Sequence, residues 1–202
     1  MEASKIVFSE AERRLIADAE IILTKNLAID KIVELFGQLA NKFRQISVPL
    51  QPQFPQLFSI HPKISRGEKH LGLPWVILDY PRYFDKTSGQ LAIRTLFWWG
   101  HYFSIRLHAS GIYFQPFVAA LKESAKFKDW IYGITDNPWD LNLPNPGWAD
   151  INSNTAKEIE GPVLVLAKKI PISEWESVKD FSKDYELLID LLKNALGTEP
   201  VK

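Results

Sequence analysis

Apolar residues recur at intervals of three and four along the first 47 residues, which is the spacing of one helical face. Ser9 is followed three positions later by Glu12, the pattern of a capping box, so a first helix is expected to begin there and to run to about Lys25. A second stripe consists of Ile29, Ile32, Val33, Phe36, Leu39, Ala40 and Phe43. The pattern predicts a hairpin of two helices over residues 1–47, with apolar faces that need a partner.

Residues 47–63, SVPLQPQFPQLFSIHPK, are rich in proline, with four prolines among 17 residues. Proline lacks a backbone donor and has a fixed φ, so neither a long helix nor a central strand is expected here. Phe54, Leu57, Phe58 and Ile60 give this stretch more apolar surface than a free linker carries. We therefore predict that residues 48–72 form a loop draped over the core.

The middle of the chain, residues 73–170, is typical of β-structure. Its strand-like segments are rich in aromatic and β-branched residues and are bounded by Gly, Pro or Ser. They are residues 73–80, 91–99, 101–109, 129–134 and 162–170. A turn is expected at Pro81, a short helix is expected to open at Pro116, and a long irregular loop follows residue 134.

A final helix is predicted over residues 173–196. Ser173 and Glu176 repeat the capping-box spacing, an apolar stripe follows, and Gly197 is a suitable stop. Helices at both ends of a block of strands indicate a single α+β domain. We expect a mainly antiparallel sheet of about five strands, packed against the N-terminal hairpin and the long C-terminal helix.

Gly100 predicts a tight turn between two strands. If Gly100 and His101 form a two-residue turn, Trp99 pairs with Tyr102, and alternation then sorts the side chains onto two faces. Phe103, Ile105, Leu107 and Ala109 are expected on the helix-covered face together with Ala92, Arg94, Leu96 and Trp98. On that face Arg94 would need a carboxylate partner or a place near the edge of the sheet.

The other face of this hairpin is the predicted binding site. It combines large rings with polar groups, which is typical of small-molecule pockets. The candidate residues are Phe97, Trp99, Tyr102, Ser104, Arg106 and His108. Arg106 would supply a bidentate donor, and the rings would stack on the guest. The alternative is that the proline loop or the long loop covers this face and satisfies its polar groups.

Charge and composition narrow the classes of function. The 202 residues contain 24 basic and 24 acidic side chains, so nucleic-acid binding is not expected. Cysteine is absent, which removes disulfides, thiolate nucleophiles and cysteine-type metal sites. No signal peptide is recognisable, and no uncharged apolar run approaches the roughly 20 residues of a membrane span. These observations favour a cytoplasmic protein with no membrane partner.

Few motifs of known chemistry are present. The four histidines show no metal-ligand spacing, and the chain has no nucleotide-binding glycine motif, so neither a metal nor another cofactor is predicted. The run HPKISRGEKHLG carries Lys63, Arg66, Lys69 and His70 and could contact an anion or simply be solvated. Trp139 and Trp148 could form an exposed platform or anchor the long loop.

Three functions are compatible with the sequence. The leading hypothesis is a protein that binds a small polar or anionic molecule, or a protein segment, on the aromatic-lined sheet face. One alternative is a hydrolase in which His108 is the general base, Ser104 the nucleophile and Asp79 the residue that orients the histidine. The other is a structural or protein-interaction subunit, and the sequence leaves the oligomeric state open.

Overall fold

The chain folds as an antiparallel sheet with helices packed on one side. The computed structural model describes residues 6–127, 130–137, 140–143 and 162–197. The six strands are β1 (Lys63–His70), β2 (Leu73–Asp85), β3 (Gly89–Trp98), β4 (Tyr102–Ser110), β5 (Ile131–Thr135) and β6 (Val163–Pro171). Their order in the sheet is β1-β2-β3-β4-β6-β5, and every neighbouring pair is antiparallel. The predicted α+β class is confirmed, with one strand more than expected.

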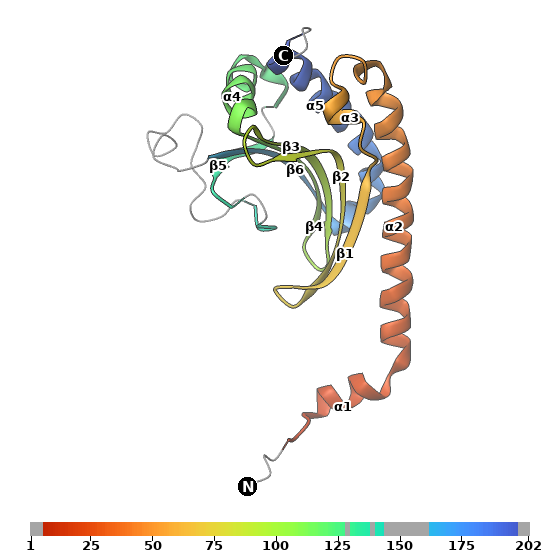
Figure 1. Ribbon diagram of the computed structural model, residues 1–202. Coiled ribbons are helices and arrows are strands. Elements are labelled where there is room, and N and C mark those ends of the chain that lie inside the picture. The colour runs from red at the N-terminus through yellow and green to blue at the C-terminus, as the bar shows by residue number, and fades with distance from the viewer. Residues whose placement is uncertain (1–5, 128–129, 138–139, 144–161, 198–202) are drawn as a thin grey trace.

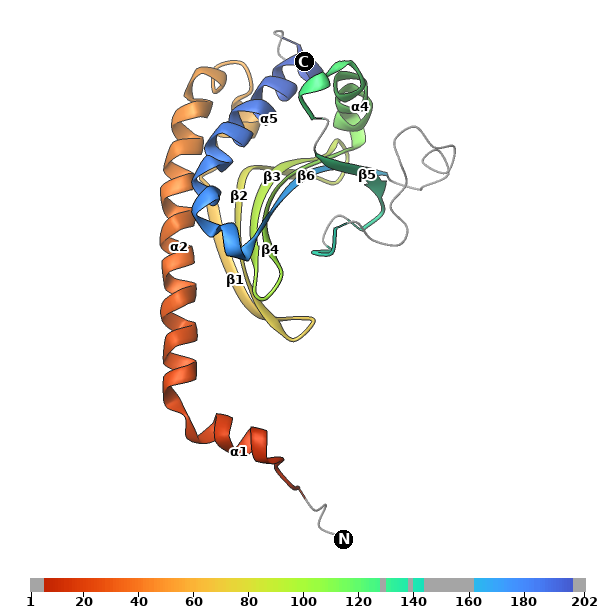
Figure 2. The same ribbon diagram turned by 180° about the vertical axis from the view of Figure 1, so that it is seen from behind.

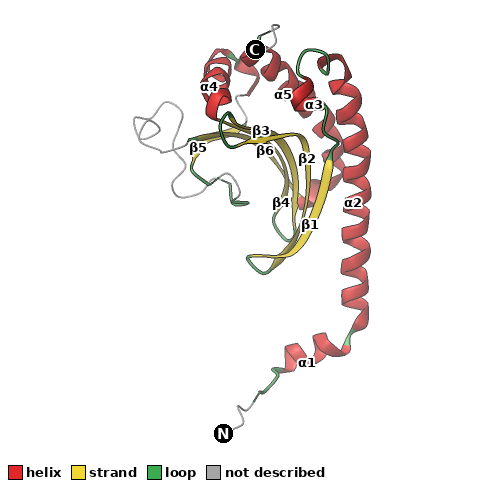
Figure 3. Cartoon of the chain, in the orientation of Figure 1, coloured by secondary structure: helices red, strands yellow, loops and turns green. Residues whose placement is uncertain are grey.

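Helices cover the convex side of this curved sheet. They are α2 (Ala19–Ser47), the short α3 (Pro55–Phe58), α4 (Phe114–Glu123) and α5 (Phe181–Leu196), and a 3-10 segment (Ile172–Asp180) precedes α5. A further helix, α1 (Glu10–Ala17), precedes α2 and lies away from the sheet. The ribbon in Figure 1 and the view from behind in Figure 2 show α2 and α5 side by side outside the curve of the strands. Among the residues that the structure describes, no helix lies on the concave side, as the colouring of Figure 3 makes clear.

The N-terminal helices differ from the predicted hairpin. The capping box of Ser9 and Glu12 is present, but the first helix ends at Ala17 rather than near Lys25. Asp18 leaves the helical conformation, and its carboxylate accepts a hydrogen bond from the Glu20 amide at 2.9 Å, which makes it the N-cap of the 29-residue α2. As a result, α1 projects away from the sheet at the end of α2 instead of folding back on it (Figure 1).

The core lies between α2, α5 and the convex side of the sheet. The predicted stripe of α2 supplies Ile29, Phe36, Leu39 and Phe43, which are buried in one cluster with strand residues. Tyr185 of α5 stacks on Phe43 with ring centroids 4.0 Å apart. Because this pattern has the period of a helix, the sequence was sufficient to identify the buried side of α2.

Two segments predicted as loop or turn are strands. Residues 63–70 of the expected draped loop form the edge strand β1, and β2 continues through the expected turn at Pro81 to Asp85. The pairing of β2 with β3 shifts between Asp79 and Arg82, which is a bulge-like irregularity. One extra residue there brings Asp79 and Arg82 to the same face of the sheet, whereas strict alternation would have separated them.

The C-terminal helix is confirmed with a different beginning. Residues 172–180 form a 3-10 segment with no side-chain capping hydrogen bond at its start, so the capping box predicted for Ser173 and Glu176 is wrong. The α-helix itself starts at Phe181, and Gly197 ends it with a φ of 72°.

Candidate functional site

The turn between β3 and β4 decides which side chains share a face. It contains three residues rather than two, because Trp98 pairs with Tyr102 and the His101 amide bonds to the Trp98 carbonyl at 3.0 Å. Gly100 is the middle one of these three residues and has a φ of 72°, a conformation that glycine adopts without strain. The predicted pairing of Trp99 with Tyr102 is therefore wrong.

This register divides the six predicted binding residues. Tyr102, Ser104, Arg106 and His108 lie on the concave side, opposite Trp98, Leu96, Arg94 and Ala92 of β3. Phe97 and Trp99 lie on the convex side, where they pack with the main core and line an apolar groove. We call the concave side of the sheet the open face. Its buried polar and charged residues include Asp79, Arg94, Ser104, Arg106 and His108.

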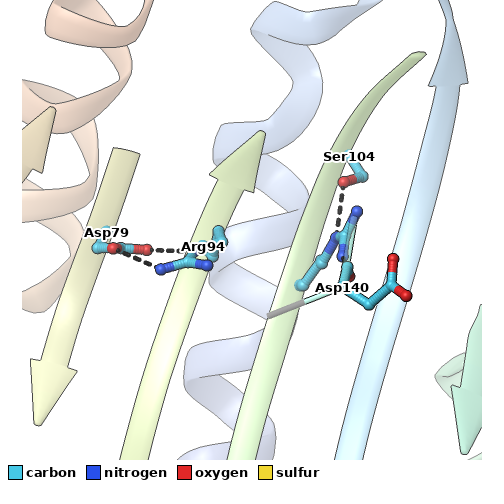
Figure 4. A network of polar contacts seen from close by, with 5 residues as sticks. Asp79, Arg94, Ser104 and Asp140 are labelled. Carbon is cyan, nitrogen blue, oxygen red and sulfur yellow. Dashed lines mark hydrogen bonds and ion pairs between the residues drawn. The ribbon is translucent and has the colours of Figure 1, made fainter. Parts of the chain in front are cut away.

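Arg94 of β3 forms an ion pair with Asp79 of the neighbouring strand β2. Its Nε and Nη2 donate to the two carboxylate oxygens of Asp79 at 2.8 and 2.9 Å, as the dashed lines in Figure 4 show. Both side chains are almost completely buried. The predicted need for a partner is confirmed, although the pair lies on the open face and not among the helices. The pairing also takes the oxygens of Asp79 away from the role expected of it in a hydrolase.

Arg106 is 1% exposed, and its guanidinium is occupied by protein groups. It donates to Ser104 Oγ at 3.0 Å, to the carbonyl of Asp140 at 3.0 Å, to the carbonyl of Leu141 at 2.7 Å and to Tyr102 Oη at 3.2 Å. Burial lowers the pKa of Arg106 to about 10, so the group is charged at neutral pH. These bonds hold the segment 140–143 over this part of the open face, as the alternative of a covering loop predicted.

Apolar contacts hold the same segment in place. Leu141 packs against Ile77, Leu96 and Trp98, while Leu143 packs against Val163, Val165 and Ala167. Tyr102 Oη also donates to the Leu141 carbonyl, and Lys169 Nζ donates to the Leu143 carbonyl. Trp139 and Trp148 of the long loop lie outside the described residues, so the platform prediction stays a prediction.

His108 lies beneath the surface. Burial is the largest cause that holds its pKa well below 6.5, and the positive charges of Arg94 and Arg106 act in the same direction. The pKa of Lys169 is lowered as well. Burial is the largest cause, and the positive charge of Arg106 is the second. At both positions the arginines of the open face add to the effect of burial and disfavour further positive charge.

Beside the covering segment, the open face is hollowed into a cavity of about 410 Å³. Its walls come from β1, β2 and β3, with Leu141 at the margin, and include Lys63, Ser65, His70, Trp75, Ile77, Asp79, Arg82, Phe84 and Arg94. The volume is in the usual range for small-molecule sites. We call this hollow the β1–β3 cavity.

The charge balance of the β1–β3 cavity is positive. Lys63, Arg82 and Arg94 line it with a single carboxylate, Asp79, which Arg94 already occupies. Arg82 Nε donates to the His61 carbonyl at 3.4 Å. Within the described ranges of the chain, no carboxylate lies within 4.0 Å of the charged atoms of Lys63 or Arg82.

Sequence reasoning identified only part of this cavity. Lys63 and His70 belong to the basic run that was considered as an anion contact, but Arg66 of the same run faces α2 and pairs with Asp30 at 3.1 Å. Arg82 was missed because the irregular register of β2 brings it to the open face. The sequence signal for β1 was an alternation in which Lys63, Ser65 and Gly67 share one face and Ile64 lies on the other. This signal was weak because it contains only one apolar residue.

The comparisons with known proteins add no constraint. No protein-family model, curated protein or solved structure matches this chain significantly. In the part of the chain that the structure describes, no helix combines the length and the apolar character that crossing a bilayer requires. Nor do three histidine, aspartate or glutamate side chains gather there in a way that could hold a metal ion.

Proposed function

We propose that this protein binds a small anionic molecule with an apolar or aromatic body in the β1–β3 cavity. The observation that carries the proposal is that Lys63 and Arg82 line one cavity without a carboxylate partner among the described residues. Two cations without a neutralising carboxylate attract anions and disfavour cations.

The walls of the β1–β3 cavity suit the rest of such a ligand. Trp75 and Phe84 offer ring surfaces, and Ile77 and Leu141 add aliphatic contacts. Ser65 and His70 can supply hydrogen bonds beside the two cations. The Asp79–Arg94 ion pair stabilises the floor, because two parallel hydrogen bonds hold both side chains in one orientation.

This proposal moves the expected site along the same face of the sheet. The sequence predicts that the guest contacts Arg106, Tyr102, Ser104 and His108 of β4. The two cations without a carboxylate partner lie two strands away in β2 (Arg82) and three strands away in β1 (Lys63). Arg106 contributes its charge to the field and holds the covering segment. The hydrolase alternative has less support, because His108 is 1% exposed and Asp79 is bound to Arg94.

Benzoate and inorganic phosphate are suitable probes, one with a ring and one without. We expect benzoate, added at low ionic strength, to cause saturable shifts of the Trp75 indole and of backbone amides near Ser65 in ¹H–¹⁵N spectra. Lys63→Ala or Arg82→Ala should weaken benzoate binding by about tenfold or more, because each removes a charge-assisted hydrogen bond. Phosphate should bind more weakly, since it lacks the ring.

Arg66→Ala is the matched control for Lys63→Ala. It removes one positive charge from the same strand but from the opposite face, where Arg66 pairs with Asp30. Affinity for benzoate should remain unchanged. The proposal is refuted if neither probe saturates, or if Arg66→Ala weakens binding as much as Lys63→Ala does.

A further inference from the structure

The N-terminal helices expose an unusual amount of apolar surface. We call residues 6–28, which comprise α1 and the first turns of α2, the N-terminal arm. Its helices carry Leu15, Ile16, Ile21, Ile22, Leu23 and Leu27, each between 46% and 67% exposed. None of the residues of α1 is buried, and the first buried residue of α2 is Ile29. A helix that is apolar on several sides is normally covered by a partner.

The same chain also contains an apolar groove. It has a volume of about 530 Å³ and lies between α2, the β3–β4 turn and the 3-10 segment before α5. Ile32, Leu35, Phe97, Trp99, Phe103 and Trp175 line it. Trp175 is 56% exposed, and its ring extends the apolar surface at one margin. Isolated apolar side chains on a surface need no explanation, but a contiguous groove beside an apolar arm indicates an interface.

We propose that two copies of this chain associate, with the N-terminal arm of each copy lying in the apolar groove of the other. An apolar helix in an apolar groove is a common mode of protein recognition. A two-fold axis would allow both arms to be covered by one self-complementary interface. The interface would be large enough, because each copy contributes both residues of its 23-residue arm and residues of its groove, and a stable interface involves roughly 20–30 residues on each side.

Charge supports a second copy as the occupant. Lys31 lies at the margin of the groove, and no carboxylate within the described residues pairs with it. The arm carries four acidic and three basic residues, and its Asp18 and Glu20 have no basic partner among the described residues. These acids can pair with Lys31 of the second copy. A helix that binds an anionic membrane surface would instead be rich in Lys and Arg.

Light scattering with size-exclusion chromatography tests the proposal on the full chain. We expect a mass of twice 23.2 kDa at micromolar concentration. Ile16→Asp in the arm and Trp175→Asp in the groove should each weaken association by about tenfold or more, because each places a charge in an apolar contact. Ile112→Asp is the matched control, since Ile112 is 52% exposed and lies in neither surface.

Mixing the two defective variants distinguishes arm-in-groove exchange from other dimers. A chain with Ile16→Asp keeps an intact groove, and a chain with Trp175→Asp keeps an intact arm. The mixture should therefore recover dimers, with one intact arm–groove contact in each, while either variant alone remains a monomer. Circular dichroism should show that both variants retain the fold, because both positions are exposed.

Three outcomes would overturn the proposal. One is a monomeric mass at all concentrations up to about 100 μM, because a stable interface of this size should hold the dimer together at lower concentrations. Another is a dimer that Ile16→Asp and Trp175→Asp leave unchanged. The third is a monomer that co-sediments with vesicles of phosphatidylcholine and phosphatidylglycerol, since a membrane and not a second copy would then be the occupant of the arm.

Discussion

Arg94 and Asp79 form an ion pair with two hydrogen bonds, 2.8 and 2.9 Å long, between the adjacent strands β3 and β2. Neither side chain is appreciably exposed, so solvent screens the attraction between the two charges only weakly. The pair separates the covered part of the open face, around Arg106, from the β1–β3 cavity. It therefore connects the stability of the sheet with the geometry of the proposed site.

Replacing one member of this pair should be costly. Asp79→Asn leaves the guanidinium of Arg94 buried without its counter-ion, and we expect the free energy of unfolding to fall by about 3 kcal/mol. Urea denaturation followed by circular dichroism measures the change. The double variant Asp79→Leu/Arg94→Leu should recover most of the loss, because it leaves no unpaired charge.

The exposed pair of Asp30 and Arg66 provides the comparison. Its partners lie 3.1 Å apart but are largely solvated, so Asp30→Asn should change the unfolding free energy by less than about 0.5 kcal/mol. An equal loss for Asp79→Asn and Asp30→Asn would contradict the assignment of Asp79–Arg94 as a buried pair.

Stability should decrease as the pH falls through the range in which unfolded histidine titrates. Burial first, and the charges of Arg94 and Arg106 next, hold the pKa of His108 well below 6.5 in the folded protein. Below pH 6.5 the unfolded chain therefore binds a proton that the folded chain does not, and protonation favours unfolding. The slope approaches about 1.4 kcal/mol per pH unit where the unfolded histidine is protonated and the folded one is not.

His108→Gln should remove this part of the pH dependence, because glutamine does not titrate. Urea denaturation at intervals between pH 7 and 5 would show the difference in slope. His61→Gln makes the same replacement at an exposed position and is the control for effects of the substitution that do not depend on burial. If the slopes of the parent and of His108→Gln are equal, His108 is not a buried neutral histidine.

Gly100 and Gly37 should respond in opposite directions to the same substitution. A Cβ would meet no atom within 4 Å at either position, but Gly100 has a φ of 72° and Gly37 lies within α2. Gly100→Ala should destabilise the protein by about 1–2 kcal/mol, since a left-handed conformation is unfavourable for an L-residue. Gly37→Ala should stabilise it by about 0.5–1 kcal/mol, because alanine favours the helix.

Thermal denaturation of the two alanine variants measures both effects. The β3–β4 register depends on the turn at Gly100, so Gly100→Ala should also broaden or shift the amide signals of Tyr102 and Ser104. Gly37→Ala should leave those signals unchanged. Stabilisation by Gly100→Ala would be inconsistent with a left-handed glycine in a three-residue turn.

Local patterns in the sequence were sufficient for much of the fold. The apolar stripe at Ile29, Phe36 and Phe43 identified the buried side of α2, and alternation identified Phe103 and Ile105 as residues that meet the helices. The Ser9–Glu12 capping box and the Gly197 stop were also correct. Each of these features depends on residues that are close in sequence, so the spacing alone predicts it.

Some features depend on contacts between distant segments or on one inserted residue, and only the tertiary structure decided these. The three-residue turn at Gly100 moved Phe97 and Trp99 to the convex side, and the shifted register of β2 moved Arg82 onto the open face. A change of one residue in a strand reverses the side of every residue beyond it, and composition does not reveal such a change.

The two arginines of the open face illustrate the difference between these levels. The sequence by itself determined that Arg106 alternates with Phe103 and Ile105 and so lies opposite the helices. Only the tertiary structure decided that the carbonyls of Asp140 and Leu141, more than 30 residues away, would accept its hydrogen bonds, and that Arg94 would find Asp79. Side-chain periodicity is a local property of the backbone, whereas the choice of partner for a buried charge depends on how distant segments pack.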